Sequence, residues 1–189
     1  MWFFGIHGSA VTSSLLAVMF SSQAYANAAA VSAGAQPEFI INSFFIDLFK
    51  GPRALALALL LIFFCKSARL KSVGKISIVP SLFSITEPMK FGIPMVLNPW
   101  LLLPMSLSAV VCELIAYFAS VIGFLPVVSV NVGRTLPPII SGFVACGWRG
   151  GLIQIIQLAV VILMYVPFLR KVDKDAKSQE VAKQEEVTA

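Results

Sequence analysis

The chain has 189 residues, of which 58% are hydrophobic and only 12% are charged, and its mean hydropathy is +0.90. Soluble domains carry about 25% charged residues, so this composition predicts an integral membrane protein. The net charge of +5 comes from basic residues beside apolar runs, without an extended aromatic-lined patch, which argues against nucleic-acid binding.

The residue types that hold cofactors and metals are sparse. No nucleotide-binding loop, nucleophile elbow or glycosylation sequon occurs, so we expect no cofactor. Three cysteines and a single histidine indicate neither a disulfide framework nor a zinc site. We interpret Cys65, Cys112 and Cys146 as small buried hydrophobic residues.

The first 35 residues are apolar and rich in small side chains. Ala24-Tyr25-Ala26 resembles a signal-peptidase site, but no Lys or Arg precedes Lys50, which disfavours a signal peptide. The alternative is a membrane helix whose small residues let neighbouring backbones come close. His7 precedes that small-residue face and is either a satisfied polar residue or, because polar groups are costly in lipid, a functional one.

Two shorter apolar segments follow. Residues 36–49 are too few to span a bilayer, and they predict an interfacial or re-entrant helix. Residues 51–65 are an Ala/Leu run behind Pro52, which suits the first turn of a helix. Four basic residues between 66 and 75 predict a short cytoplasmic loop after this run.

Residues 76–99 form an apolar segment that prolines and a glycine interrupt and that carries Glu87 and Lys90. A charged side chain at membrane depth costs about 2.5–3.5 kcal/mol on insertion scales, so it normally faces a partner or a water-filled cavity. Irregular backbone at that depth persists only where protein buries it or where it lines a cavity. The segment therefore predicts a broken, re-entrant hairpin at a binding site.

The second half of the chain repeats this alternation. Residues 100–124 are long enough to span a membrane, and we interpret their only charge, Glu113, as structural. Residues 125–150 are a second segment broken by Gly and Pro, which carries Arg134 and is either a second re-entrant hairpin or an ordinary loop with a tight turn. Residues 151–169 are the clearest spanning helix.

The predicted fold is therefore an all-α, polytopic membrane protein with spanning helices and broken re-entrant hairpins, part of a transporter domain. Residues 1–169 form that domain. Residues 170–189 form a polar tail that we expect to be cytoplasmic, solvated and largely disordered. An even number of crossings must separate the two basic segments, because both are expected on the cytoplasmic side.

Three stretches resemble one family: WFFGIHG (2–8), ITEPMKFGIPMVLNP (85–99) and LPPIISGF (136–143). They are similar in order and spacing to the membrane component, enzyme IIC, of the phosphoenolpyruvate-dependent sugar phosphotransferase system. The subgroup is that of the lactose, cellobiose and diacetylchitobiose permeases. The resemblance extends from Trp2 to about Leu169.

The resemblance implies import of a disaccharide across the bacterial inner membrane by a multi-pass permease. A cytoplasmic IIB partner, itself supplied by IIA, phosphorylates the sugar on its 6-hydroxyl, and the permease carries no phosphoryl group. Glu87 and His7 correspond to the residues that meet at the sugar, where they are candidate catalytic residues that orient its hydroxyl. Trp2 is expected to stack on the sugar, and Arg134 completes the predicted substrate-binding set. Besides sugar and IIB, membrane lipid is an expected partner.

The chain also departs from the family pattern. Thr86 stands where Asn is common, Arg134 stands where many members have Trp, and residues 50–53 replace a Gly/Ser-rich turn. Full family members are more than twice as long, and their N-terminal half makes the dimer contact, so we expect a homodimer only where that half is present. The alternative to a permease half is a truncated, non-transporting membrane remnant or an interaction subunit.

Overall fold

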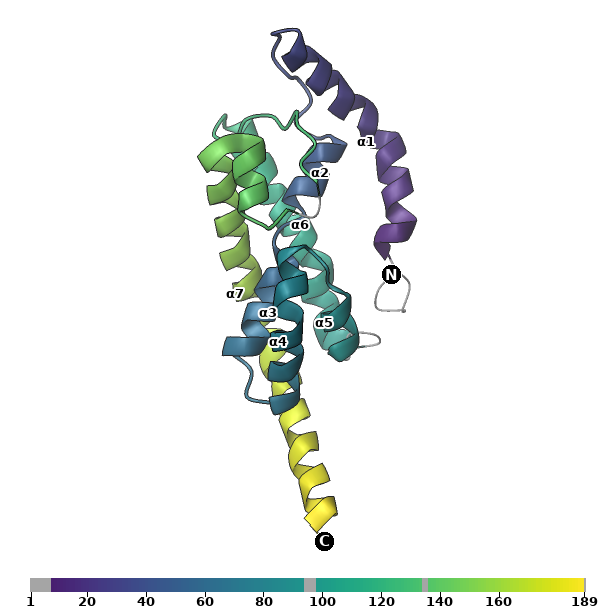
Figure 1. The fold of residues 1–189 in the computed structure, drawn as a ribbon, viewed down its shortest axis with the longest axis vertical. Coiled ribbons are helices and arrows are strands. Elements are labelled where there is room, and N and C mark those ends of the chain that lie inside the picture. The colour runs from purple at the N-terminus through teal and green to yellow at the C-terminus, as the bar shows by residue number, and fades with distance from the viewer. Residues whose placement is uncertain (1–7, 94–97, 134–135, 189) are drawn as a thin grey trace.

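The computed structural model describes residues 8–93, 98–133 and 136–188, in which all regular structure is helical. This confirms the predicted all-α fold class. The described helices are α1 (Gly8–Ser32), α2 (Ser43–Phe49), α3 (Arg53–Phe63), α4 (Ala68–Leu82), α5 (Glu87–Gly92), α6 (Pro99–Val121) and α7 (Ile140–Thr188). Helices α2 to α7 form an elongated bundle, and α1 stands to one side of it (Figure 1).

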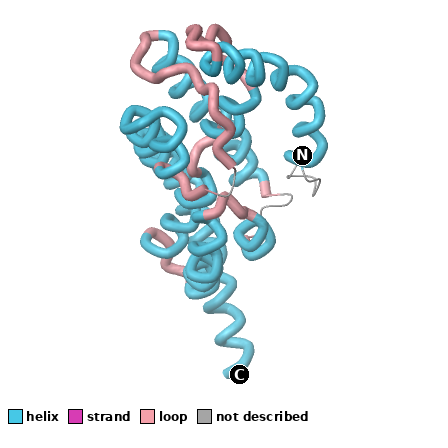
Figure 2. Tube along the Cα trace, turned by 45° about the horizontal axis from the view of Figure 1, so that its top comes forward, coloured by secondary structure: helices cyan, strands magenta, loops and turns pink. Residues whose placement is uncertain are grey.

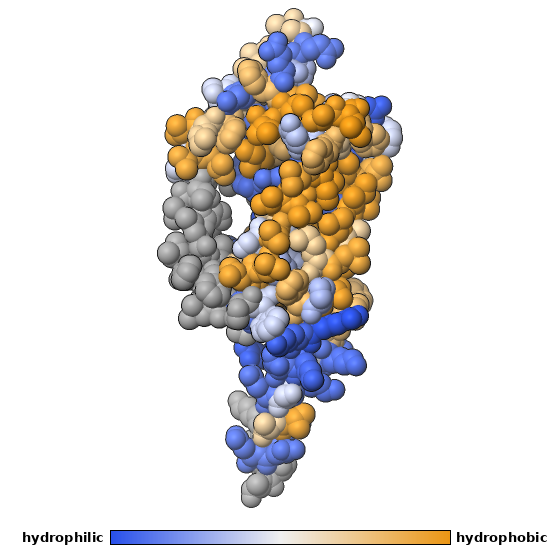
Figure 3. All heavy atoms as spheres, turned by 180° about the vertical axis from the view of Figure 1, so that it is seen from behind, coloured by the Kyte–Doolittle hydropathy of each residue, from blue (hydrophilic) through white to orange (hydrophobic). Residues whose placement is uncertain are grey.

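Helices α6 and α7 are both long and apolar enough to cross a membrane. The 23 residues of α6 rise by about 34 Å, which matches a hydrocarbon core of about 30 Å. Seen from behind, the surface shows a broad apolar belt between hydrophilic regions at the two ends of the molecule (Figure 3). The predicted spanning segment 151–169 lies within α7, whereas the predicted segment 100–124 runs three residues beyond the end of α6 at Val121.

Helix α7 contains a sharp bend at Cys146 and Gly147, where Gly147 has a φ of 64°. Its first turns, residues 140–145, therefore fold back on the long part of the helix. Gly142 and Gly150 touch backbone to backbone at the crossing, and a Cβ atom on Gly150 would overlap the carbonyl oxygen of Gly142. The second broken segment of the sequence thus combines both predicted alternatives, because its described residues 125–133 and 136–139 are irregular loop and only its last part enters the tight helical hairpin.

The apolar interior has two parts. One joins α3, α4, α5 and the adjoining turns of α6 and α7 around Leu61, Leu70 and Met89. The other joins α2, the end of α6 and the hairpin around Phe49 and Leu125. Helix α3 is buried on nearly all sides, which explains why a run too short to span a bilayer is nevertheless apolar throughout.

The loops from α1 to α2 and from α6 to α7 begin at the end of the molecule opposite the C-terminus (Figure 2). Asn27 of α1 holds the first of these loops, because its side-chain amide donates to the carbonyl oxygen of Phe39 at 2.7 Å and its oxygen accepts from the backbone nitrogens of Glu38 and Phe39. Helix α1 passes through Ala24-Tyr25-Ala26 without a break.

The prediction that the C-terminal tail is largely disordered is wrong, because α7 continues to Thr188. Leu169 and Val172 are buried, and Ala176 packs on the same cluster, so the apolar stripe of the helix continues past the spanning segment. Beyond this stripe most side chains are exposed, as the polar composition predicts. Residues 148–188 rise by about 60 Å, roughly twice the hydrocarbon thickness.

Candidate functional site

The α4–α5 hairpin presents Glu87, the central residue of the predicted site. The chain leaves α4 through Ser84, which has a φ of 60°, and Glu87 is the first residue of α5. The Glu87 Oε2 atom accepts a hydrogen bond from the backbone nitrogen of Thr86 at 3.0 Å. Pro88 follows in the first turn, where a missing N–H costs nothing, so the local sequence favours a helix start that holds the carboxylate.

The short helix α5 is anchored at its other side. Met89 and Ile93 are 1% and 0% exposed and pack in the interior that α3 and α4 form. Gly92 lies against Val73 of α4, and a Cβ atom at this position would come within 2.6 Å of the Val73 Cγ1 atom. Glu87 therefore belongs to a rigid hairpin rather than to a free loop.

Compensating charges surround this hairpin in the interior of the bundle. The Lys90 ammonium interacts electrostatically with Glu87 and with Arg53 at the start of α3. Arg53 also acts on Glu113 of α6, as does Lys50. Helices α3, α5 and α6 thus bring half-buried acids and bases into one region, where they partly compensate one another.

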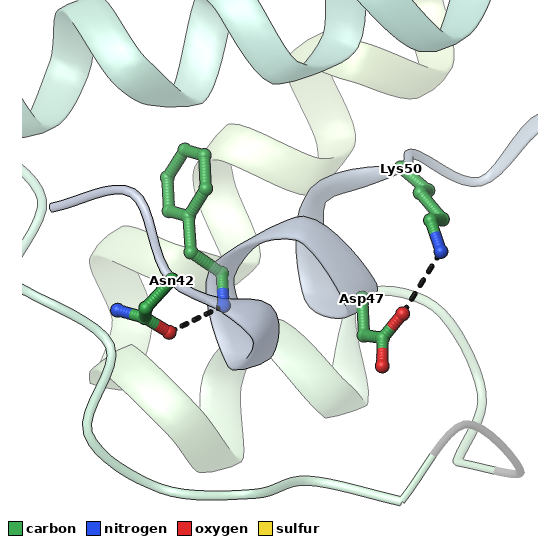
Figure 4. A network of polar contacts seen from close by, with 4 residues as sticks. Asn42, Asp47 and Lys50 are labelled. Atoms are coloured by element: carbon green, nitrogen blue, oxygen red, sulfur yellow. Dashed lines mark hydrogen bonds and ion pairs between the residues drawn. The ribbon is translucent and has the colours of Figure 1, made fainter. Parts of the chain in front are cut away.

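A second polar cluster holds α2 (Figure 4). The Asn42 Oδ1 atom caps the helix by accepting from the backbone nitrogen of Phe45 at 3.0 Å. The Asn42 amide group donates to the carbonyl oxygen of Val128, 86 residues further along the chain, at 3.0 Å. At the other end of α2, the Lys50 Nζ atom lies 2.9 Å from the Asp47 Oδ1 atom. The cap joins α2 to the α6–α7 loop.

Two buried glutamines on α7 bind backbone groups of neighbouring segments. They were not among the residues predicted from the sequence. The Gln154 Oε1 atom accepts from the backbone nitrogens of Ile139 and Gly142, and its Nε2 atom donates to the Leu48 carbonyl oxygen at 3.1 Å. The Gln157 Nε2 atom donates to the carbonyl oxygen of Cys112 at 2.8 Å. Their signal was present, since two amides three residues apart share one face of an apolar helix.

Gln154 also fixes an unusual backbone. Ile139 has a φ of 75°, a conformation that a β-branched residue adopts only under strain. Its N–H group is held by Gln154, and the adjacent Ser141 side chain exchanges hydrogen bonds with the same amide at 3.2 and 3.3 Å. Such strain persists only where the surroundings over-determine the conformation, and it clusters at functional sites.

Of the predicted site residues, Glu87 lies in the part of the chain that the structure describes, at the place given above. Trp2, His7 and Arg134 lie outside the described residues, so their approach to Glu87 stays a prediction. Within the described ranges, no group of three or more His, Cys, Asp and Glu side chains could hold a metal ion.

Comparison with known proteins gives the family. The family model described as "Phosphotransferase system, EIIC" matches residues 1–109. This chain belongs to that family. It is 34% identical to the oligo-beta-mannoside-specific EIIC component of Bacillus subtilis (strain 168), over 98% of the chain and 44% of that relative. It is 31% identical to the lactose-specific EIICB component of Staphylococcus aureus, over 97% of the chain and 33% of that relative.

A solved structure supports the same assignment for the EIIC chain. The transporter ChbC, the IIC component of an N,N'-diacetylchitobiose-specific phosphotransferase system, superposes with a TM-score of 0.89 and 33% identity. The match covers 95% of this chain and 43% of ChbC. The EIIC chain therefore spans less than half the length of these relatives.

Proposed function

We propose that this EIIC chain is the substrate-binding half of a permease that imports a disaccharide while a IIB partner phosphorylates it. The observation that carries the proposal is the superposition on the transporter ChbC over 95% of the chain, at 33% identity. Oligo-beta-mannoside, lactose and N,N'-diacetylchitobiose name the specificities of the relatives, which favours the class of lactose, cellobiose and diacetylchitobiose as substrate.

In this proposal Glu87 is the group that handles the reacting hydroxyl. Its carboxylate accepts a hydrogen bond from the 6-hydroxyl of the sugar and takes the proton as the oxygen attacks the phosphoryl group carried by IIB. The new phosphorus–oxygen bond forms on the sugar, and the bond to IIB breaks. His7 holds the carboxylate in place, Trp2 stacks on the sugar ring, and Arg134 binds its hydroxyls.

The proposed orientation places the C-terminal end of α7 in the cytoplasm of a bacterial cell, with the chain crossing the inner membrane more than once. The surface on that side of the apolar belt is strongly hydrophilic (Figure 3), and basic residues are frequent in both segments that lie there, 66–75 and 170–177, which favours a cytoplasmic position by the positive-inside rule. IIB, which is supplied by IIA, docks from the same side. The name EIICB of the lactose-specific relative favours a IIB partner for this chain too.

The second candidate, a non-transporting remnant or interaction subunit, is favoured by the surface of α1. Leu15, Val18 and Met19 are 62%, 82% and 53% exposed, and among the described helices α1 packs mainly on α2. In a complete permease, the N-terminal half would cover this face of α1. That half is also where we expect the homodimer contact.

The test is phosphorylation of radiolabelled disaccharides by membranes that hold the chain, together with purified IIA and IIB. Membranes with the unaltered chain are expected to form sugar phosphate, and Glu87→Gln membranes are expected to form at least 100-fold less, within the usual range for a general base. Glu113→Gln removes a carboxylate from the same interior and is expected to keep most of the activity. If the unaltered chain is expressed normally but forms no sugar phosphate, the result would favour the non-transporting remnant.

A further inference from the structure

Eight basic side chains gather where the apolar belt ends on the side of the C-terminus. One precedes α4, three lie on the first eight residues of α4 and four lie on α7, and all are exposed. We call them the basic collar: Lys66, Arg69, Lys71, Lys75, Arg170, Lys171, Lys174 and Lys177. In Figure 3 a strongly hydrophilic surface lies directly below the apolar belt at this level.

Two cations of the basic collar lie on aromatic rings at the edge of the belt. The Lys171 Nζ atom is 3.4 Å from the centroid of the Trp100 ring, and the Arg170 Cζ atom is 5.6 Å from the centroid of the Phe64 ring. Trp100 stands at the start of α6 and Phe64 just after α3. Aromatic rings beside basic residues mark the level of lipid headgroups.

Two carboxylates of α7 beside the basic collar bind groups at the start of α4. The Asp173 Oδ1 atom accepts from the backbone nitrogens of Lys66 and Ser67, each at 2.9 Å. The Glu180 Oε1 atom accepts from the Ser67 hydroxyl at 2.6 Å and from the backbone nitrogen of Arg69 at 2.9 Å. Both carboxylates face the positive end of the α4 dipole, and Glu180 also interacts electrostatically with Arg69, so most of the collar's positive charge is left at the surface.

We propose that the basic collar binds the phosphate groups of anionic phospholipids in the leaflet that it faces. The inference rests on the orientation given under the proposed function, in which this leaflet is cytoplasmic. Clusters of four to eight basic residues immediately beside a membrane helix attract anionic lipid, because the leaflet carries a negative surface potential. The position of the collar at headgroup level, fixed by the rings of Trp100 and Phe64, favours lipid over an acidic protein that docks from the water.

The test measures association of spin-labelled phosphatidylglycerol and phosphatidylcholine with the full chain in vesicles. We expect a preference for phosphatidylglycerol at 0.1 M salt that is largely lost at 1 M, because the screening length falls from about 10 Å to about 3 Å. Replacing Arg170 and Lys171 together by Gln is expected to lower the association constant of phosphatidylglycerol at least fivefold, since each basic residue contributes about fivefold.

A matched control is available at the opposite end of the belt. Arg149 lies 5.6 Å from the centroid of the Trp148 ring and donates to the carbonyl oxygen of Phe124, and among residues 98–133 and 136–169 it is the only basic residue. Arg149→Gln removes one cation from an aromatic ring and is expected to leave the lipid preference unchanged. Replacing Lys71 and Lys75 by Gln gives a second collar variant that spares both rings, in case the first one fails to fold.

Three results would overturn the proposal. The first is equal association of the two lipids with the unaltered chain, or an equal loss in Arg149→Gln. The second is displacement of spin-labelled phosphatidylglycerol by soluble glycerol phosphate at matched concentration, which would make the collar a site for free phosphate. The third is an unchanged lipid preference in both collar variants together with lost binding of purified IIB, which would make it a protein-docking surface. Sugar is absent from the assay, so none of these results depends on transport.

Discussion

The two ends of the long helix α7 use polar side chains in opposite ways. Near the hairpin, where the surroundings are apolar, the neutral amides of Gln154 and Gln157 hold backbone groups of α2, α6 and the α6–α7 loop. Beyond the apolar belt, the carboxylates of Asp173 and Glu180 hold the start of α4. The comparison shows how dielectric selects chemistry, because an amide is much cheaper to bury than a charge.

The largest effect is expected at the backbone crossing of the hairpin. Gly150→Ala places a methyl group on the carbonyl oxygen of Gly142, which is backbone and cannot move aside without opening the hairpin. Overpacking typically costs about 1–3 kcal/mol, and an overlap with backbone that no side-chain movement relieves is expected to cost more, about 4 kcal/mol or above. In Gly151→Ala, the matched control, the nearest atom would lie 3.5 Å away. Thermal unfolding in detergent should show a large fall in the unfolding midpoint for Gly150→Ala alone. A similar fall in the midpoint for both variants would contradict the described crossing.

The end of α7 that carries Gln154 and Gln157 should be nearly as sensitive to substitution. Gln154→Leu leaves the N–H groups of Ile139 and Gly142 and the carbonyl oxygen of Leu48 without their partner. Each unsatisfied buried group costs about 1–3 kcal/mol, so we expect a loss of about 3 kcal/mol or more in unfolding free energy.

Gln179→Leu is the control for this variant, because Gln179 lies on the exposed part of the same helix. It is expected to leave the unfolding midpoint within the error of the measurement. If Gln154→Leu were as stable as the unaltered chain, the buried amide would not hold the hairpin.

The carboxylate end should respond more weakly. Asp173→Asn keeps the shape of the side chain but removes the charge that faces the start of α4. Loss of a favourable charge at a helix N-terminus costs about 0.3–1 kcal/mol. Hydrogen exchange of the amides of residues 66–69 is expected to quicken, while the amides near Gln154 keep their protection. Uniform quickening along the chain would show that the two ends are not independent.

The smallest effect concerns the reactivity of Cys65, which lies beside this helix N-terminus. Burial, and to a lesser degree the charge of Asp173, raises the pKa of the Cys65 thiol to about 12. At pH 8 the thiol is therefore almost entirely protonated, and alkylation by maleimide should be very slow. Peptide mass spectrometry should show faster labelling of Cys65 in Asp173→Asn. Fast labelling of Cys65 in the unaltered chain would contradict the burial of its thiol.

Much of the architecture could be predicted because its signals are local. The Ala/Leu run behind Pro52 gave α3, and the length and hydropathy of residues 100–124 gave α6. The break before Glu87 predicted the α4–α5 hairpin, but the prediction of a short loop over residues 66–75 is wrong, because α4 begins at Ala68 and continues through Pro80. In each case the residues that decide the structure lie within a few positions of one another.

The remainder depends on partners that are distant in the sequence. Gln154 bonds to Leu48, 106 residues away, and Asp173 bonds to Lys66, 107 residues away. No local pattern in residues 170–188 indicates that α4 will hold them, so composition alone predicted disorder. In the structure, the start of α4 has backbone N–H groups without a partner inside the helix, and Asp173 and Glu180 of α7 accept hydrogen bonds from this segment.

The central claim is that Glu87 is the carboxylate that holds the sugar hydroxyl, and equilibrium binding of disaccharide tests it most directly. Calorimetry on the chain in nanodiscs should show binding of at least one disaccharide of the lactose, cellobiose and diacetylchitobiose class. Affinity should fall at least tenfold in Glu87→Gln, because a hydrogen bond to a charged group contributes about 1.5–3 kcal/mol, and it should be retained in Glu113→Gln. Equal affinity of Glu87→Gln and the unaltered chain would contradict the account.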